Sequence, residues 1–241
     1  MSDHSITSQP QGRVVLISGA SRGIGRAIAR AMLDSGWRVS IGTRQPVPEF
    51  SNLTSTHFHW ARFDAQDPET EREWVADAHR HFGRIDAIVH NAGILSERSV
   101  IEATPHEFDE IFEVNVKSPM RLTQQVWPYL QQAPEGKVLV IASLAGKRVR
   151  AAEGGLYSMS KAAALMLAHG IRHAGDATRI RCTALCPGFV ATDMAAGVED
   201  VIKAQLTRPE EVARIAKLVL ELPATASVAE IPVSWRVESG F

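Results

Sequence analysis

Seven short apolar runs alternate along this chain with helical patterns, and this alternation constrains the fold more than any other feature. The runs are rich in β-branched and aliphatic residues, which is typical of buried strands. Strands that alternate with helices of about ten residues or more form βαβ units. We therefore expect an α/β architecture, a doubly wound parallel sheet of about seven strands with helices on both faces. The expected strands are residues 13–18, 38–44, 57–63, 86–90, 138–142, 180–185 and 231–237.

A glycine-rich turn joins the first expected strand to the helix that follows it. Gly19, Gly23 and Gly25 have the spacing G-x-x-x-G-x-G, and the helical pattern after them stops at Gly36. A strand, a glycine turn and a helix in this order place free N–H groups where a phosphate can bind. A tight turn without a ligand is the plain alternative, but the context favours nucleotide binding. The expected cofactor contacts here are Gly19, Ser21, Arg22, Gly23, Ile24 and Gly25.

Arginines replace the acidic residue that NAD-preferring folds carry after the second strand. Thr43 and Arg44 stand where an acid would contact the ribose 2′-hydroxyl. Arg44, with Arg22 from the glycine turn, could instead pair with a 2′-phosphate. Two solvated surface arginines are the alternative interpretation. The pattern favours NADP(H) over NAD as the cofactor.

A tyrosine and a lysine stand one helical turn apart in the helix expected after the fifth strand. Tyr157 and Lys161 at i and i+4 project from the same helix face, and Ser143 comes fourteen positions before the tyrosine. An ammonium favours the ionised form of a nearby phenol, so we expect the pKa of Tyr157 to be lowered. Such a phenol can donate and accept a proton in catalysis.

Composition excludes several classes of protein. The 241 residues are 45% apolar and 22% charged with a net charge of −1, which gives no sign of nucleic-acid or membrane binding. No apolar run reaches about 18 residues, and residues 1–12 are polar and predict a flexible tail before a single domain over residues 13–241. Cys182 and Cys186 lie roughly 13 Å apart along a strand, too far to bridge. We expect a cytoplasmic protein with reduced cysteines.

The motifs together resemble the short-chain dehydrogenase/reductase family of single-domain NAD(P)-dependent oxidoreductases. The resemblance extends over residues 13–223, and its specificity comes from the order of several motifs. It implies a Rossmann fold and a hydride transfer between nicotinamide and a carbonyl or alcohol. The motifs are Gly19-x-x-x-Gly23-x-Gly25, Asp64, Asn91-Ala92-Gly93, Asn115, Ser143, Tyr157-x-x-x-Lys161 and Pro187-Gly188-x-Val190-x-Thr192.

The family resemblance implies a role for each catalytic residue. Tyr157 is expected to be the general acid or base, and Ser143 to hold the substrate oxygen. Lys161 is expected to lower the pKa of the tyrosine and to bind the nicotinamide ribose. Asn115 is expected to anchor a water that links Lys161 to solvent.

The same resemblance implies the remaining cofactor contacts. Asp64 is expected to bind the adenine amino group, while Asn91 and Gly93 line the cleft. Contacts to the nicotinamide ring and its carboxamide are expected from Pro187, Gly188, Val190 and Thr192.

The chain departs from the family pattern at three places. Ser18 replaces a common threonine but keeps a hydroxyl, and His90 replaces the usual asparagine before Asn91 without removing a catalytic group. The C-terminal segment around Glu230-Ile231 lacks the common Asp-Gly-Gly ending. It is more similar to a branch of the family that acts on small hydroxy acids and related alcohols.

Two groups of charged or titratable residues leave alternatives open. Lys147, Arg148 and Arg150 follow Ser143 and form either a solvated basic loop or a site for a substrate carboxylate or phosphate. His169 and His173 have a spacing that could bind a metal, but no acidic residue accompanies them, so we expect no metal site.

Two apolar groups complete the predictions. Met194, Val198, Val201 and Ile202 have the spacing of one helical face and predict a compact lid over an apolar pocket. The family forms subunit contacts through the helices of Asn115 and Tyr157, so a homotetramer or homodimer is expected. Leu165, Met166 and Leu167 fit such contacts or an internal core equally well.

The function predicted from the sequence is an NADP(H)-dependent carbonyl reductase or alcohol dehydrogenase acting on a small or medium substrate. A 3-oxoacyl reductase acting on carrier-bound acyl chains is one alternative. A non-catalytic NADP(H)-sensing protein is a second alternative, although a sensor has no need to keep Ser143, Tyr157 and Lys161.

Overall fold

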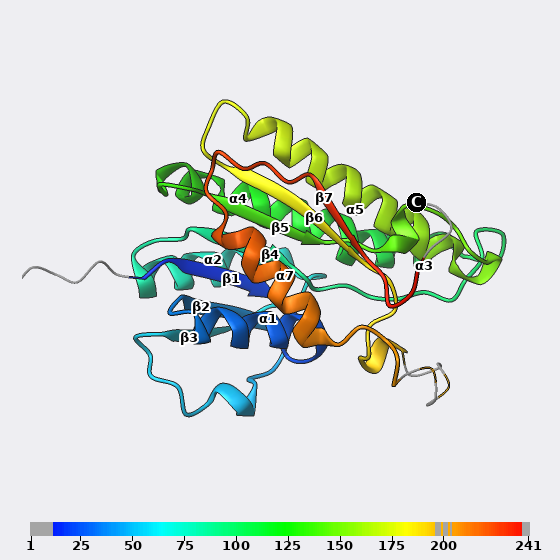
Figure 1. Ribbon diagram of the computed structural model, residues 1–241, viewed down its shortest axis with the longest axis horizontal. Helices are drawn as coiled ribbons and strands as arrows, with labels where there is room; N and C mark the ends of the chain where they lie inside the picture. Colours follow the sequence, from blue (N-terminus) through cyan, green and yellow to red (C-terminus); the bar gives the residue numbers. More distant parts are fainter. Residues whose placement is uncertain (1–11, 196–198, 200–201, 203, 238–241) are drawn as a thin grey trace, which may run out of the picture.

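A seven-stranded parallel sheet forms the centre of the molecule (Figure 1). The computed structural model describes residues 12–195, 199, 202 and 204–237, so the expected tail lies outside the described residues apart from Gly12. The strand order β3-β2-β1-β4-β5-β6-β7 confirms the doubly wound α/β fold. The strands are β1 (Val14–Ser18), β2 (Arg38–Thr43), β3 (Phe58–Arg62), β4 (Ala87–His90), β5 (Lys137–Ile141), β6 (Arg181–Pro187) and β7 (Glu230–Val233).

Helices cover both faces of this sheet (Figure 1). The helices α1 and α7 pack side by side on one face, and α2, α4 and α5 cover the other. The bounds are α1 (Gly23–Asp34), α2 (Pro68–Phe82), α3 (Pro105–Phe112), α4 (Ser118–Gln132), α5 (Gly155–Ala174) and α7 (Pro209–Glu221). Short 3₁₀ turns are η1 (Pro48–Phe50), η3 (Leu144–Gly146), η4 (Ala152–Gly154) and η5 (Asp193–Ala195). None of the helices in the described part of the chain is long and apolar enough to cross a membrane.

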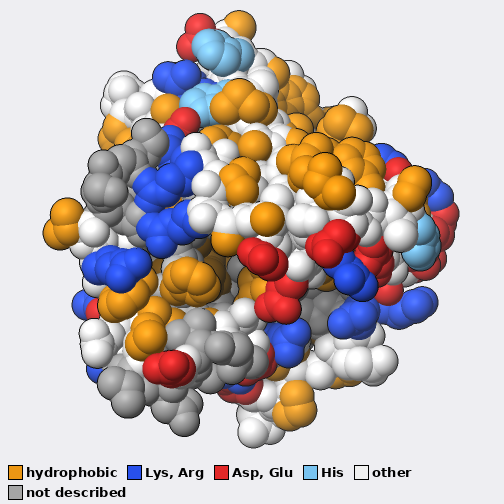
Figure 2. Space-filling view, turned by 90° about the vertical axis from the view of Figure 1, so that its right-hand side faces the viewer, with side chains coloured by type: hydrophobic (Ala, Val, Ile, Leu, Met, Phe, Trp, Pro, Cys, Tyr) orange, Lys and Arg blue, Asp and Glu red, His pale blue; other side chains and the backbone are white. Residues whose placement is uncertain are grey.

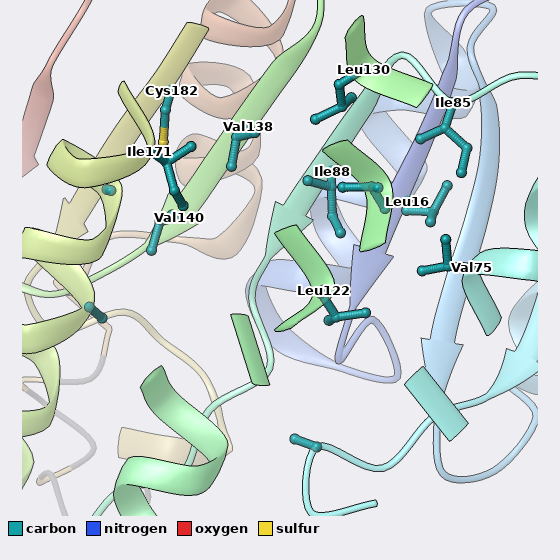
Figure 3. Packing of buried hydrophobic residues seen from close by; sticks show 14 of the residues in the cluster. Leu16, Val75, Ile85, Ile88, Leu122, Leu130, Val138, Val140, Ile171 and Cys182 are labelled. Carbon is teal, nitrogen blue, oxygen red and sulfur yellow. The ribbon is translucent and has the colours of Figure 1, made fainter. Parts of the chain in front are cut away.

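Burial on both faces explains why the strands appear in the sequence as continuous apolar runs. Val14 and Leu16 of β1 belong to the core beneath α2, α4 and α5, part of which Figure 3 shows. Val15 and Ile17 belong to the core beneath α1 and α7. Since successive side chains of a strand point to opposite faces, every residue of β1 is buried.

The helix ends that the sequence predicts are confirmed. Asp67 caps α2 by accepting from the Glu69 amide, and Gly83 ends it in the left-handed conformation with φ of 74°. Thr104 and Glu107 form a complete capping box at α3. The expected long helix after Thr104 is interrupted by a π-helical turn, η2 (Glu113–Lys117), which joins α3 to α4. Asn115 lies within this turn.

The parallel arrangement brings the carboxyl ends of the strands to one edge of the sheet. The chain runs from β1 outward to β2 and β3, then returns to β4 on the other side of β1. In such sheets the point where the strand order reverses leaves a crevice between neighbouring loops. The loops after β1 and β4 both line a cavity at this edge.

Candidate active site

A cavity of about 870 Å³ lies at this edge of the sheet. Its volume falls within the range of small-molecule and cofactor sites, roughly 300–1,000 Å³. Almost all predicted site residues line it; Gly25 and Asn115 pack behind its wall. Those that line it are Gly19, Ser21, Arg22, Gly23, Ile24, Arg44, Asp64, Asn91, Gly93, Ser143, Tyr157, Lys161, Pro187, Gly188, Val190 and Thr192.

The glycine turn needs glycine for reasons of conformation and space. Gly19 and Gly23 have φ of 68° and 55°, in the left-handed region. A Cβ at Gly19 would lie 2.8 Å from the Ala92 Cα, and one at Gly25 would lie 2.3 Å from the Asn91 side-chain nitrogen. The turn is therefore packed directly against the segment that follows β4.

Asn91 and Ser18 fix the ends of β1 and β4 to each other. The Asn91 Nδ2 donates to the carbonyls of Ser18 and Gly19 at 3.0 and 2.9 Å. The Ser18 hydroxyl accepts from the amides of Asn91 and Ala92, both at 3.1 Å. The Ser18 hydroxyl thus holds the two loops in register, a role that the hydroxyl of a threonine at this position could also fill. The side-chain amide of Asn91 donates both of its hydrogen bonds to backbone carbonyls of the protein.

The start of α1 is suited to an anion. Its N-cap residue, Arg22, gives no side-chain capping bond among the described residues, and the first turn carries no acidic residue. The first N–H groups of a helix lack intrahelical partners and carry partial positive charge. This end of α1 lies at the cavity, so a phosphate group fits the residues present.

The side chains after β2 and β3 define one end of the cavity. Thr43 is buried, and its hydroxyl accepts from the Trp60 indole at 2.8 Å and donates to the Gln45 carbonyl at 2.6 Å. Arg44 follows it at the cavity wall, and Asp64 lines the wall from the end of β3. The end of β2 therefore carries Thr43 and Arg44 where NAD-preferring folds carry a carboxylate.

Arg22 forms an ion pair that sequence reasoning missed. Its guanidinium lies 3.1 Å from the Asp193 carboxylate, and both side chains are largely exposed. Asp193 follows Thr192 at the start of η5, and the Thr192 methyl is the nearest atom to a Cβ placed on Gly23. The glycine turn and the segment after β6 therefore meet across the cavity.

Ser143, Tyr157 and Lys161 line the same cavity from two adjoining elements. Ser143 lies just beyond β5, where its hydroxyl accepts from the Ala145 amide at 3.1 Å and donates to the Pro187 carbonyl at 3.3 Å. Tyr157 and Lys161 lie in the first turns of α5. The Lys161 ammonium donates to the Ile141 carbonyl at 3.0 Å and lies 5.8 Å from the centroid of the Tyr157 ring.

The expectation that the pKa of Tyr157 is lowered is wrong for this structure. Burial raises the pKa of Tyr157 to about 12, and a hydrogen bond with the Ser143 side chain only partly opposes this. Burial also lowers the pKa of Lys161 to about 8. The Lys161 ammonium donates to the Ile141 carbonyl. The loss of solvation of the Tyr157 phenolate therefore outweighs the attraction between this ammonium and the phenolate.

Comparison with known proteins adds the deciding observation. The family model described as short chain dehydrogenase matches residues 13–202. The chain belongs to this family. The predicted family and the predicted Rossmann fold are confirmed.

Several relatives of this short-chain dehydrogenase are known by name. An agropine synthesis reductase of Rhizobium rhizogenes is 35% identical over 95% of this chain but 54% of its own length. The chain thus spans about half the length of the agropine synthesis reductases it matches. An acetoacetyl-CoA reductase of Shinella zoogloeoides is 27% identical, with coverages of 84% and 88%. An alcohol dehydrogenase from Thermococcus sibiricus superposes with a TM-score of 0.83 at 28% identity, covering 94% of this chain and 99% of its own.

The role expected for Asn115 stays a prediction, and the structure restricts how its side chain can serve. The Asn115 Oδ1 accepts from the Ile94 amide at 2.9 Å. Its Nδ2 donates to the Ile94 carbonyl and to the Ser160 hydroxyl, both at 3.0 Å. The amide therefore holds the irregular segment after Gly93 against α5, beside Lys161.

His90, the departure from the family asparagine, is a buried neutral residue. It is 2% exposed, and its Nε2 lies 2.8 Å from the Thr123 hydroxyl. Its Nδ1 has no hydrogen-bond partner among the described residues. Burial lowers the pKa of His90 from 6.5 to about 3.

Acid should therefore destabilise this protein partly through His90. The folded state resists protonation of His90 down to about pH 3, whereas the unfolded chain takes up the proton near pH 6.5. Stability should fall as the pH drops through this window, by about 5 kcal/mol at most. We expect His90→Asn to lose less unfolding free energy between pH 7 and pH 4, as measured by urea denaturation. The exposed His106→Asn is the control, and equal slopes for both variants would contradict this account.

Lys147, at the start of the basic loop, is held in an ion pair. Its ammonium pairs with the Glu230 Oε2 at 2.5 Å, and the Glu230 Oε1 lies 2.7 Å from the His169 Nε2. Glu230 therefore ties the loop after Ser143 to α5 and β7. His169 is engaged there, and the described residues hold no group of three His, Cys, Asp or Glu suited to a metal.

The lid expected from four apolar residues can be assessed only in part. Met194 lies in η5 and lines the cavity, while Val198 and Val201 lie outside the described residues. Sequence reasoning also missed cavity residues from other loops, including Leu95 and Phe189. Phe189 follows the Pro187-Gly188 pair directly, which was a usable signal. Leu95 had none, because its place depends on how the loop after β4 folds.

Proposed function

We propose that this enzyme is an NADP(H)-dependent carbonyl reductase or alcohol dehydrogenase acting on a small or medium substrate. One observation carries the proposal: a single cavity is lined by the glycine turn at α1 and by Ser143, Tyr157 and Lys161. The Thermococcus relative was solved with 5-hydroxy-NADP, which agrees with the same cofactor class. NADPH consumption with a panel of carbonyls, and NADP⁺ reduction with the matching alcohols, would test this reaction class.

The proton is handled by the protein. When bound, the nicotinamide supplies or accepts the hydride. Tyr157 donates its phenolic proton to the carbonyl oxygen in reduction and accepts the alcohol proton in oxidation. Ser143 holds the substrate oxygen close to the phenol. Lys161 provides positive charge beside the phenolate that forms and holds the ribose hydroxyls. The phenol is protonated at neutral pH, as a proton donor in reduction must be.

The other predicted residues have roles in binding the cofactor. The backbone from Gly19 to Gly25 and the start of α1 hold the pyrophosphate, and Asp64 contacts the adenine. Asn91 and Gly93 shape the cleft between them. The segment from Pro187 to Thr192 would hold the nicotinamide and its carboxamide. Arg44 and Arg22 would hold the 2′-phosphate, and Arg22 would exchange its pairing with Asp193 for this contact.

Arg44→Asp should change the cofactor preference towards NADH. The substitution removes a cation that would pair with the 2′-phosphate and adds a carboxylate that repels it while it can accept from a 2′-hydroxyl. We expect the ratio of kcat/KM for NADPH over NADH to fall by roughly 100-fold, since a lost charged hydrogen bond accounts for about 1.5–3 kcal/mol. Steady-state kinetics with both cofactors measure this ratio. Arg62→Asp, on β3 and outside the cavity lining, is the control; an unchanged ratio in the Arg44 variant would refute the assignment.

A 3-oxoacyl reductase is the alternative that a specific observation favours. The chain is 28% identical to a 3-oxoacyl-[acyl-carrier-protein] reductase of Salmonella typhimurium over 79% of its length. Comparing 3-oxoacyl thioesters with simple ketones would decide between the two substrates. The non-catalytic sensor is not supported, because the chain belongs to an oxidoreductase family and keeps the three residues that catalysis needs.

We also propose a homodimer or homotetramer built on α4 and α5. Leu165 is buried and serves the internal core, whereas Met166 is 59% exposed on the same helix. Met120 of α4 and Met159 of α5 are exposed as well. These side chains give the outer surface of the two helices an apolar character that a second subunit could cover.

A further inference from the structure

A carboxylate behind the site joins the loop that carries Ser143 to the helix that carries Tyr157. Glu230 of β7 accepts from the Lys147 ammonium at 2.5 Å, and its other carboxylate oxygen lies 2.7 Å from the His169 Nε2. Lys147 ends the turn that Ser143 begins, and His169 lies on α5 about three turns after Tyr157. One side chain therefore contacts both of the elements that present the proposed catalytic hydroxyls.

All three members of this network belong to sequence features to which the proposed function assigns no role. Lys147 starts the basic loop, His169 belongs to the histidine pair, and Glu230 lies in the segment that departs from the family pattern. Figure 2 shows the molecule from the side where the strands end, with a hollow that has hydrophobic side chains inside it. The three network residues are not among the described residues that line the cavity at this edge, so they lie behind its wall.

The turn from Ser143 to Lys147 is stiff enough to transmit the position of one end to the other. The Gly146 amide donates to the Ser143 carbonyl, and the Lys147 amide donates to the Leu144 carbonyl, both at 3.0 Å. A Cβ at Gly146 would lie 2.6 Å from the backbone of Lys161, so the turn packs directly on α5. A displacement of Lys147 would therefore displace Ser143 relative to this helix.

The carboxylate also lies close to the end of β6, where the Ser143 hydroxyl finds its acceptor. Burial raises the pKa of Cys186 on β6 to about 11, and the nearby charge of Glu230 adds to this shift. The next residue is Pro187, whose carbonyl accepts from the Ser143 hydroxyl at 3.3 Å. The same hydroxyl forms a hydrogen bond with the Tyr157 side chain. Glu230 is thus placed behind the contacts that orient Ser143.

The network is held by charge as well as by hydrogen bonds. The hydrogen bond from Lys147 lowers the pKa of Glu230, burial opposes this effect, and the hydrogen bond with His169 lowers the pKa further. The three side chains are between 21% and 26% exposed. Because salt screens a partly buried pair less than an exposed one, this connection persists at physiological ionic strength.

We propose that Glu230 is a positioning residue, which through Lys147 and His169 holds the Ser143 turn against α5 at the spacing that proton transfer at Tyr157 requires. The inference rests on the proposed oxidoreductase function and adds a residue that acts without contacting substrate or cofactor. Without the carboxylate, the turn keeps its attachment to β5 but loses the attachment of its far end. The Ser143 hydroxyl then no longer holds the substrate oxygen in line with the phenol.

Glu230→Ala and Lys147→Met should each lower kcat by roughly 10- to 100-fold, since misplacing a reacting group by about 1 Å costs this much. The affinity for NADPH should stay unchanged, because the network lies outside the cavity lining. Single-turnover hydride transfer with a carbonyl that the wild type reduces measures the first effect, and fluorescence titration measures the second. Lys147→Arg keeps the cation and should retain most of the activity. Glu73→Gln, exposed on α2, is the control that should match the wild type.

The link to α5 is tested by a second matched pair of variants. His169→Ala should lower kcat in the same direction as Glu230→Ala, because it detaches the carboxylate from the helix of Tyr157. His173→Ala changes the same residue type one turn later, where the side chain is exposed, and should leave kcat unchanged. Equal kcat values in the two histidine variants would contradict a role for this link.

A double-variant cycle separates positioning from a general effect on stability. Combined with Ser143→Ala, Glu230→Ala should cost little further activity, because the hydroxyl that the network positions is already absent. A merely structural role of Glu230 predicts the same fold loss with and without Ser143, and that result would overturn the proposal. If Glu230→Ala does not fold, Lys147→Met takes its place in the cycle, since it leaves Glu230 paired with His169.

Amide hydrogen exchange keeps this proposal separate from the proposed function, because it requires no turnover. We expect exchange in residues 144–150 to become roughly tenfold faster or more in Glu230→Ala and Lys147→Met, with exchange in α7 unchanged. Faster exchange confined to this segment would support the positioning role even if no tested carbonyl is reduced. Wild-type exchange in both variants, or faster exchange with wild-type kcat, would overturn the proposal whatever carbonyl the enzyme reduces.

Discussion

Tyr157→Phe should reduce turnover by roughly 10²- to 10⁴-fold while NADPH still binds. The substitution removes one oxygen atom and leaves the ring, which packs near the Lys161 ammonium. The proposed proton transfer then has no donor in reduction and no acceptor in oxidation. Because the cofactor contacts assigned to the glycine turn do not involve the phenol, the affinity for NADPH should change little. Stopped-flow hydride transfer measures the first effect, and NADPH fluorescence titration measures the second.

The chain offers a matched control for this variant. Its only other tyrosine, Tyr129, lies on α4 and stacks on His79 with ring centroids 4.3 Å apart. Tyr129→Phe removes the same oxygen far from the cavity lining and should keep wild-type turnover. Near-wild-type turnover in the Tyr157 variant would exclude this residue as the acid. Equal losses in both variants would indicate a general effect on folding.

Local patterns in the sequence predicted most of the fold. The inner strands β1, β2, β4, β5 and β6 are short and buried on both faces, so each apolar run is visible without knowledge of its neighbours. The two ends of α2, at Asp67 and Gly83, were predicted correctly because they depend on contacts within one or two helical turns. The π-turn at Glu113–Lys117 was not, because no short motif distinguishes it from a continuous helix.

The candidate site could be predicted only where spacing along one element determines it. Tyr157 and Lys161 share a helix, and Ser143 lies at the end of the strand that leads towards it. Contacts between distant segments were not predictable: Lys147 and Glu230 are 83 positions apart. The predicted direction of the Tyr157 pKa shift was wrong for a related reason. The solvation of the phenol depends on every group packed around it, and not only on its neighbour in the helix.

A partly buried ion-pair network behind the site could not be predicted from the sequence either. Arg121 of α4 donates to both carboxylate oxygens of Glu71 at 2.7 and 2.8 Å and to Glu113 at 2.5 Å. Glu71 is fully buried on α2. Burial disfavours the charged form of Glu113, but hydrogen bonds from Arg121 and Lys117 outweigh it and lower the pKa of Glu113. The hydrogen bonds that Arg121 donates to Glu71, and after them the one to Glu113, raise the pKa of Arg121.

Arg121→Met should therefore destabilise the protein by about 3–5 kcal/mol, the usual cost of leaving a buried charge without its partner. The methionine fills much of the arginine volume, so the loss reflects the uncompensated Glu71 carboxylate rather than a cavity. Urea denaturation at pH 7 measures it. The control Arg72→Met breaks an exposed pair with Glu69 and should cost no more than about 1 kcal/mol.

A second substitution distinguishes charge from packing in this network. Glu71→Leu combined with Arg121→Met removes both members of the buried pair and should recover a large part of the lost stability. Arg121 also anchors Glu113, the first residue of the π-turn that holds Asn115 against the segment after Gly93. The double variant should consequently regain stability while turnover stays reduced. If stability fails to return, packing rather than the buried charge determines the loss; if turnover returns in full, the network does not position Asn115.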